Sequence, residues 1–281
     1  MRRKEQFASY LFLLTACISI AAVILICLFL FANGIPAMRE IGLFNFLSGR
    51  VWRPSNDLYG ILPMILGSIY VTAGALLLGV PLGILTAVYL ANFCSRELHR
   101  FLKPLIELLA GIPSVVYGFF GLVVLVPFVR QTFGGSGNSI LTASLLLGIM
   151  ILPTIIGISE AALRAVPSSY YEGSLALGAS HERSVIFAIL PAAKSGILTG
   201  VVLGVGRAIG ETMAVMMVAG NQTRMPDGIL KGIRTLTSNI AIEMGYAADL
   251  HREALIATAV VLFVFILIIN VSFSLLKRRS V

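Results

Sequence analysis

The sequence predicts an all-α membrane protein with six transmembrane helices. Of its 281 residues, 58% are hydrophobic and only 12% are charged, whereas soluble domains are about 45–50% apolar. Six apolar stretches are each long enough, as a helix, to cross a hydrocarbon core of about 30 Å. Because lipid offers no partner to unpaired backbone groups, we expect one helical bundle, with residues 1–281 as a single domain.

The first expected span, at about 11–32, follows a basic N-terminus. It is longer than the apolar part of a secretory signal, so we expect it to be retained. The second span, at about 59–92, contains Gly79 and Gly83 around Pro81, a pattern that permits a close helix contact and a kink. The remaining spans are expected at about 104–129, 139–165, 191–219 and 254–276.

The basic residues predict the topology. The formal net charge is +8, and Lys and Arg are enriched in cytoplasmic segments of membrane proteins. Basic residues cluster at 2–4, 95–103 and 277–279, which predicts that both termini are cytoplasmic. We therefore expect membrane lipid, and no nucleic acid, to explain the charge. The three cysteines form no disulfide or metal pattern.

A polar segment, residues 166–190, separates the fourth and fifth spans. Ser169 with Glu172 three residues later has the spacing of a capping box that opens a helix, and Gly178 suits the left-handed residue that closes one. The pattern predicts a cytoplasmic knob of two short helices, which would dock another protein. A capped connecting loop is the alternative interpretation.

Four charged residues lie inside apolar stretches, and such residues are functional candidates. Glu107 and Glu160 each have a basic residue four positions away, Lys103 and Arg164. Both pairs are near a cytoplasmic end, where pairing within a helix and snorkelling explain them.

The other two charged residues, Arg207 and Glu211, lie near the middle of the fifth expected span. As residues of one continuous helix, they would be one turn apart on one face. The same stripe continues back through Gly204, Gly200 and Gly196, a spacing that brings another helix close. The pair is therefore expected to face the protein interior. It would serve either as a substrate site or as a structural salt bridge.

The polar segment resembles the EAA loop of ABC-importer permeases. The matching residues are Glu172-Gly173-Ser174, then Gly178, then Leu190-Pro191, with Ala188 where the family has Ile. This resemblance implies that Ser169, Glu172, Gly178 and Pro191 belong to a loop that couples to a cytoplasmic ATPase. The sequence has no Gly-x-x-x-x-Gly-Lys-Ser/Thr phosphate loop, so ATP and Mg are expected in a partner and no cofactor in this chain.

A second resemblance is more specific. The run Gly206–Asn221, the run Gly111–Gly118 and the outer Trp52-x-Pro54 resemble the permeases of the bacterial phosphate-specific ABC importer. Met213-Ala214, after Gly-Glu-Thr, is similar to the PstC type of these permeases rather than to the PstA type. The resemblance covers nearly the whole chain.

This resemblance implies the type I importer permease (MetI-like) fold, a core of five spans with a peripheral first helix. It implies import of inorganic phosphate from periplasm to cytoplasm across the bacterial inner membrane. The implied partners are a PstA-type permease, a PstB-type ATPase dimer and a periplasmic phosphate-binding protein. It also implies that Arg207 and Glu211 are tied to phosphate passage.

The alternatives are a permease for another oxyanion, a secondary anion transporter and a purely structural subunit. A secondary transporter is expected to show broken helices in both halves of an inverted repeat, and the sequence offers no matching pair. An inert subunit has little reason to keep charges at mid-membrane. We expect no catalytic residue and no metal site, because His181-Glu182 lacks the second histidine of zinc proteases.

Overall fold

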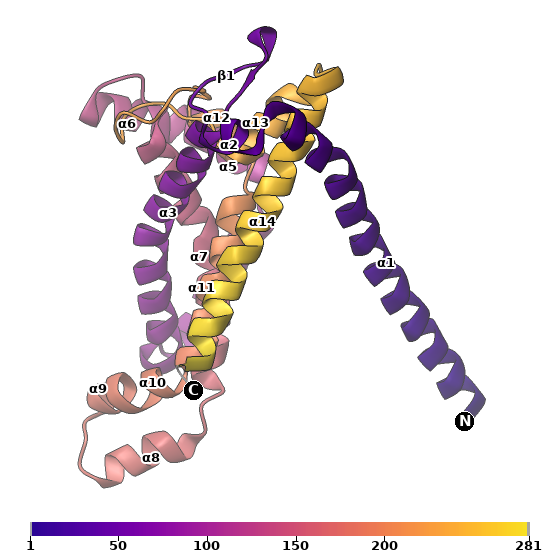
Figure 1. Ribbon diagram of the computed structural model, residues 1–281. Helices are drawn as coiled ribbons and strands as arrows, with labels where there is room; N and C mark the ends of the chain where they lie inside the picture. The colour runs from indigo at the N-terminus through magenta and orange to yellow at the C-terminus, as the bar shows by residue number, and fades with distance from the viewer. Residues whose placement is uncertain (1, 280–281) are drawn as a thin grey trace.

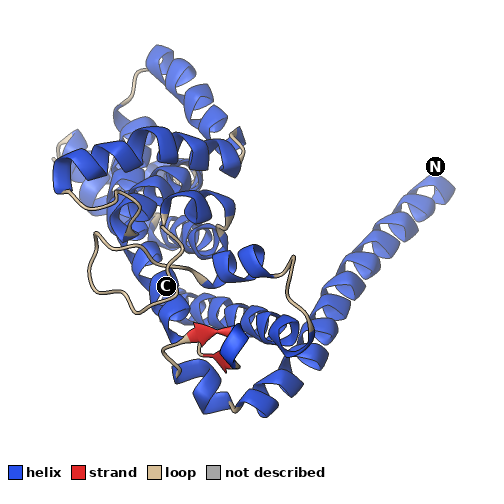
Figure 2. Ribbon diagram, turned by 90° about the horizontal axis from the view of Figure 1, so that it is seen from above, coloured by secondary structure: helices blue, strands red, loops and turns tan. Residues whose placement is uncertain are grey.

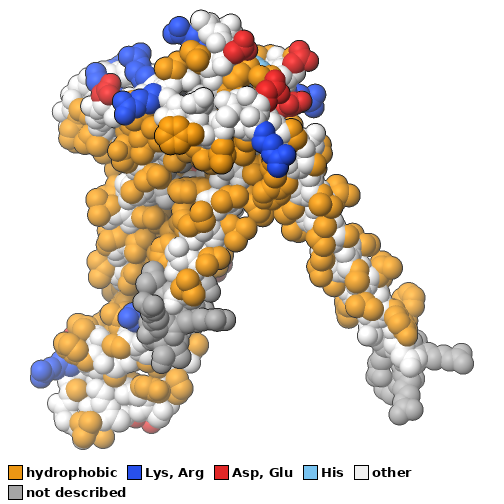
Figure 3. Space-filling view, viewed as in Figure 1, with side chains coloured by type: hydrophobic (Ala, Val, Ile, Leu, Met, Phe, Trp, Pro, Cys, Tyr) orange, Lys and Arg blue, Asp and Glu red, His pale blue; other side chains and the backbone are white. Residues whose placement is uncertain are grey.

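The protein is built almost entirely from helices, and α3 (Leu62–Val88), α7 (Ile140–Arg164), α11 (Lys194–Gly210) and α14 (Asp249–Arg279) lie side by side (Figure 1). The computed structural model describes residues 2–279. Within that range, five helices are long and apolar enough to cross a membrane, or six if a pair bent by 67° is one span. Figure 3 shows hydrophobic side chains over the middle of the molecule, with most charged ones toward its two ends. The expected all-α membrane fold is confirmed.

The elements fall into three sets. The long helices are α1 (Arg2–Ile41), α3 (Leu62–Val88), α4 (Arg96–Gly111), α7 (Ile140–Arg164), α11 (Lys194–Gly210) and α14 (Asp249–Arg279). The short helices are α2 (Leu43–Ser48), α5 (Ser114–Phe120), α6 (Val126–Phe133), α8 (Ser168–Ala176), α9 (His181–Ser184), α10 (Leu190–Ala192), α12 (Met213–Val218) and α13 (Leu236–Glu243). The others are the 3-10 turn η1 (Pro54–Asn56), the π-helical turns η2 (Tyr89–Phe93), η3 (Gly121–Leu125) and η4 (Val185–Ile189), and an antiparallel hairpin of β1 (Trp52–Arg53) and β2 (Leu58–Tyr59).

Helix α7 packs against both α3 and α11, and glycines make both contacts possible. A Cβ added at Gly83 of α3 would lie 2.7 Å from Cγ2 of Ile155, and one added at Gly204 of α11 would lie 3.0 Å from Cγ1 of the same side chain. Gly200 and Gly196 continue the α11 contact along α7. No side chain fits between these backbones without a shift, as the glycine spacing predicted.

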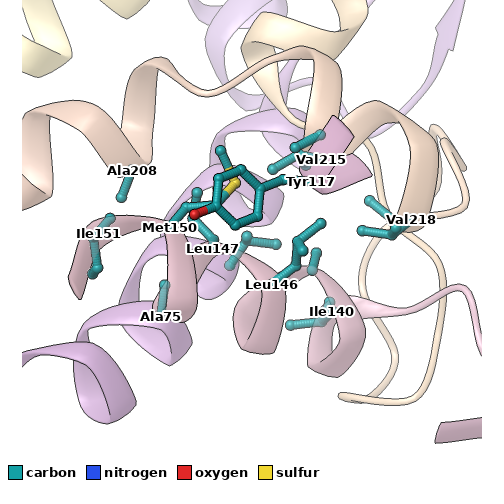
Figure 4. Close-up of a cluster of buried hydrophobic side chains, with 14 of the residues drawn as sticks. Ala75, Tyr117, Ile140, Leu146, Leu147, Met150, Ile151, Ala208, Val215 and Val218 are labelled. Carbon is teal, nitrogen blue, oxygen red and sulfur yellow. The ribbon is translucent and has the colours of Figure 1, made fainter. Parts of the chain in front are cut away.

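Above this contact, a cluster of buried hydrophobic side chains joins further elements to α7 (Figure 4). Tyr117 of α5 and Val215 of α12 point toward Leu147 and Met150 of α7. Helix α12 is too short to be stable by itself, and the burial of its Val215 and Val218 in this cluster stabilises it.

The third expected span was wrong in its bounds. Residues 104–129 do not form one helix, because Ile112 is extended (φ −68°, ψ 127°) before Pro113. A residue before proline is disfavoured in the helical region. Helix α4 therefore runs from Arg96 to Gly111, and the stretch suited to crossing the membrane is Ser114–Phe133.

The fifth expected span, 191–219, is broken at two places. Its start bends by 67° between His181–Ala192 and Lys194–Gly210. Its end breaks after Gly210, where Glu211 is extended (φ −69°, ψ 130°), and the chain resumes as α12. The expected continuous helix was therefore wrong.

Helix α1 leaves the bundle, as Figures 1 and 2 show. Only its last part packs on α14, through an edge-on contact of Phe31 with Phe263 and the approach of Gly34 to Val260. A peripheral first helix agrees with the resemblance. Both ends of the chain lie on the same side as α8 and α9 (Figure 1). The side chains of the basic residues 2–4 and 277–279 lie outside what the structure describes.

The opposite end of the bundle is closed by a cap around the buried carboxylate of Glu243. Trp52 Nε1 donates to Oε2 at 2.8 Å, His251 Nε2 lies 2.8 Å from the same oxygen, and the Arg234 guanidinium contacts Oε1. Burial raises the pKa of Glu243, but the hydrogen bonds from Trp52, His251 and Arg234 outweigh it, so the pKa is lowered. The cap is therefore held by an ionised carboxylate.

Glu243→Gln should destabilise the protein by roughly 3–5 kcal/mol at neutral pH, since it leaves Arg234 without its buried partner. The ionised Glu243 stabilises the fold above an unfolded pKa of about 4.3, and this contribution is lost as the pH falls through the lowered folded pKa. The difference in Tm between parent and variant should therefore shrink on acidification. Fluorescence of Trp52, the single tryptophan, reports unfolding directly. The exposed Glu253→Gln is the control, and a pH-independent difference would contradict this account.

Candidate functional site

Arg207 lies in the last turn of α11 and is half-buried. Its Nη1 donates to Oγ1 of Thr154 on α7 at 3.3 Å. Among the residues described, no carboxylate lies within 4.0 Å of its guanidinium. The unpaired carbonyls at the end of a helix carry partial negative charge, which stabilises a cation in the last turn. Most donors of the Arg207 guanidinium thus remain available.

Glu211 does not face Arg207 along a helix. Its carboxylate accepts a hydrogen bond from the backbone N–H of Ala214 at 3.1 Å, at the start of α12. Its main-chain oxygen accepts from Thr237 Oγ1 of α13 at 3.0 Å. The expected one-turn pair is wrong because Glu211 has extended backbone and its carboxylate is used to begin the next helix. Glu211 therefore holds the break between α11 and α12.

The helix break and two glycines give α11 an open face beside Arg207. A Cβ added at Gly206 or at Gly210 would meet nothing within 4 Å, in contrast to Gly204. Leu203, on the same stripe, is exposed. Irregular backbone at membrane depth is tolerated where it is buried in protein or lines an aqueous path. Sequence reasoning recognised the packed glycine face of α11 but missed this open one, although Gly206 and Gly210 have the same four-residue spacing.

The polar segment forms the two-helix knob expected, but it begins differently. Helix α8 starts at Ser168 with Pro167 as its N-cap and no side-chain cap, so the capping box of Ser169 and Glu172 is wrong. Proline fixes the start of the helix two residues earlier than an N-cap at Ser169 would. Gly178 has φ +83° and closes α8, as expected. Ser169, Glu172 and Gly178 are all exposed.

The knob presents apolar side chains beyond the apolar middle of the molecule. Leu177, beside Gly178, is 91% exposed, and Phe187 and Tyr170 are also exposed. These exposed apolar side chains suit contact with another protein. Pro191 lies in α10, just before the 67° bend into α11.

His181 joins the knob to the end of α3, a role that sequence reasoning missed. Its Nε2 lies 3.1 Å from the main-chain oxygen of Asn92, and its Nδ1 lies 2.9 Å from the hydroxyl of Tyr171. Since a carbonyl can only accept, Nε2 donates to Asn92, and in the neutral imidazole Nδ1 then accepts from the tyrosine hydroxyl. The ring also contacts Phe93 edge-on. A movement of α8 and α9 would thus reach η2, the π-helical turn that follows α3.

Comparison with known proteins identifies the fold and family. Residues 79–281 match the family described as binding-protein-dependent transport system inner membrane component. The chain belongs to this family. The chain is 41% identical to a probable ABC transporter permease, YqgH, of Bacillus subtilis, covering 96% of this chain and 90% of that protein. It is 36% identical to the phosphate transport system permease PstC of Mesorhizobium japonicum, covering 85% and 80%.

The resemblance of this permease to the PstC type is therefore confirmed. Its fold is also similar to a chain of the inward-facing MetNI methionine ABC transporter, with a TM-score of 0.61 at 20% identity, covering 82% of this chain and 100% of that one. At that identity the likeness concerns the fold alone. The expected type I importer permease (MetI-like) fold is confirmed, and the permease is a multi-pass transport subunit.

The two glycine faces of α11 predict opposite effects of one substitution. Gly204→Val should destabilise the permease by about 1–3 kcal/mol, because the new side chain overlaps Ile155. At Gly206 an added Cβ would meet nothing within 4 Å, so Gly206→Val should leave stability within about 0.5 kcal/mol of the parent. Thermal unfolding in detergent measures both variants. Equal Tm values for the two would contradict the assignment of a packed face and an open face.

Proposed function

We propose that this permease is the PstC-type transmembrane subunit of an ATP-driven importer that moves inorganic phosphate from the periplasm to the cytoplasm. The observation that carries the proposal is Arg207, a guanidinium without a carboxylate partner among the described residues, beside a helix break and an open face. A planar guanidinium offers several fixed donors that match phosphate oxygens. The phosphate transport named for the PstC relatives supports the same substrate.

The open face of α11 needs a second wall to enclose a path. A PstA-type permease would supply it, so the phosphate would pass between two subunits. Energy would come from a PstB-type ATPase dimer that binds ATP and Mg and docks on the knob formed by α8 and α9. A periplasmic phosphate-binding protein would deliver the anion to the opposite end. The permease would then lie in the bacterial inner membrane with both termini in the cytoplasm.

In this proposal Arg207 and Glu211 have different tasks. Arg207 contacts the passing anion transiently, because most of its donors are free and its charge is stabilised by the end of α11. Glu211 keeps the break in place through Ala214 and Thr237. High affinity at this point is unnecessary, since the binding protein captures the phosphate.

Arg207→Gln should reduce phosphate uptake at least 100-fold in proteoliposomes that hold the complete complex, while assembly and ATP hydrolysis persist. Arg207→Lys should retain part of the uptake, because the charge remains but the planar donors are lost. Arg224→Gln, an exposed residue elsewhere, is the matched control. Parent-like uptake by Arg207→Gln would refute the role of Arg207.

The same assay separates the alternatives. Uptake of labelled sulfate in preference to phosphate would indicate another oxyanion. Phosphate uptake in the absence of the ATPase or ATP would indicate a secondary transporter.

Gly206→Val should fold normally yet slow uptake, because the valine narrows the proposed path.

Valine substitutions at two glycines, one within α8 and one just after it, test whether an ATPase docks on the knob. Gly178→Val forces a β-branched residue to φ +83° and should weaken co-purification of the ATPase about 10-fold, because it distorts the docking loop. Gly173→Val adds the same side chain at a position where an added Cβ would meet nothing within 4 Å and φ is not positive, so it is the control. Undiminished ATPase binding by the Gly178 variant would argue against docking at this turn.

A further inference from the structure

Beside α4, at the end of the bundle that carries α8 and α9, the structure has a cationic pocket of about 460 Å³. It lies against η2, whose Asn92 both lines the pocket and contacts His181 of α9. The cationic or ionisable side chains in its lining are Arg96, His99, Arg100, Lys103 and Arg164. The proposed passage at Arg207 uses none of them.

A single buried carboxylate stands behind this pocket. Glu160 of α7 accepts from Lys103 Nζ at 2.8 Å and from Arg164 Nε at 2.9 Å, and lies 2.7 Å from His99 Nε2. Its one charge is thus shared among several groups, and it fixes Lys103 and His99 in place. Both expected contacts with residues four positions away, of Glu160 with Arg164 and of Glu107 with Lys103, are present. In this cluster Glu160 and Glu107 balance Lys103 and Arg164, so the excess positive charge of the pocket lies on Arg96 and Arg100.

Two guanidinium groups complete the pocket without any counterion. Among the residues that the structure describes, neither Arg96 nor Arg100 has a side-chain hydrogen bond or ion pair. Both are exposed at the rim of the pocket. The pocket therefore has fixed positive groups at its base and available guanidinium donors at its rim, an arrangement that favours a phosphoryl group.

The face of α4 that points away from the pocket indicates where the pocket lies relative to the membrane. Its exposed apolar side chains Leu98, Phe101, Leu105 and Leu108 recur at helical spacing, opposite Arg96, Arg100 and Lys103. A helix of this kind lies in the plane of the interface with its apolar face in lipid. The cationic pocket is then at the level of the lipid headgroups, where basic pockets between membrane helices bind anionic headgroups.

We propose that this pocket binds a phosphoryl group, that of an anionic phospholipid headgroup, with Arg96 and Arg100 as the contacts at its rim. Free inorganic phosphate presents the same chemistry, so the test must distinguish the two sources. The site is separate from the passage at Arg207, and its binding assay is independent of transport.

The test compares the full-length parent with the double variant Arg96→Gln/Arg100→Gln, both purified in detergent. Native mass spectrometry measures adducts with phosphatidylglycerol and with phosphatidylcholine, and equilibrium dialysis measures labelled inorganic phosphate. The matched control is Arg224→Gln/Arg252→Gln, which removes the same charge from two exposed residues outside the pocket. The rim arginines have no internal partner, so thermal unfolding should match the parent.

We expect the double variant to bind phosphatidylglycerol about 30-fold more weakly than the parent and the control, from the loss of two interfacial arginines. Phosphatidylcholine should bind poorly to all three. Competition by millimolar phosphate, or phosphate binding that only the parent and the control show, would assign the pocket to free phosphate as well. Equal phosphatidylglycerol binding by all proteins, equal binding of the two lipids, or binding of neither ligand by the parent would overturn the proposal.

Discussion

The close contact of α7 with glycines of α3 and α11 is the constraint on which the rest of this permease depends. In lipid there is little hydrophobic force between helices, so association relies on close packing and on satisfied polar groups. Ile155 shows how tight the contact is, because one side chain fills the space against both Gly83 and Gly204. The three helices thus form a rigid unit, and α1, α4 and the knob attach to its edges or ends.

Polar groups are treated differently at the ends of this unit and in its middle. Glu160 and Glu243, at opposite ends, are buried and have donors on both oxygens. Such networks hold elements together, and each joins segments that are far apart in sequence. Arg207 has instead one threonine hydroxyl and the partial charge of a helix end. The helix end stabilises the positive charge of Arg207, and no carboxylate of the described residues neutralises it. Such a charge suits transient contact with an anion.

The break after Gly210 explains how α11 can both pack against α7 and present Arg207 with no carboxylate partner in the part of the chain that the structure describes. Before the break, α11 uses Gly196, Gly200 and Gly204 to bind α7. At the break, the extended Glu211 redirects the chain into α12, whose apolar side chains enter the core cluster. A continuous helix would carry Glu211 back beside Arg207 and would neutralise it. The interruption keeps the carboxylate apart and leaves the half-buried guanidinium of Arg207 without a carboxylate partner among the described residues.

The sequence by itself determined the fold class, the family and the packed face of α11, because apolar length, basic flanks and glycine spacing are local properties. It also determined the left-handed turn at Gly178, which depends on one residue. Pro113 is a local signal for the break in the third span, but only the tertiary structure decided where the fifth span breaks. The break after Gly210 depends on the competition of the Glu211 carboxylate for the N–H of Ala214. The contacts of Glu160 with α4, of His181 with Asn92 and of Glu243 with Trp52 join distant segments. No local pattern encodes such contacts, since they exist only once the helices have packed.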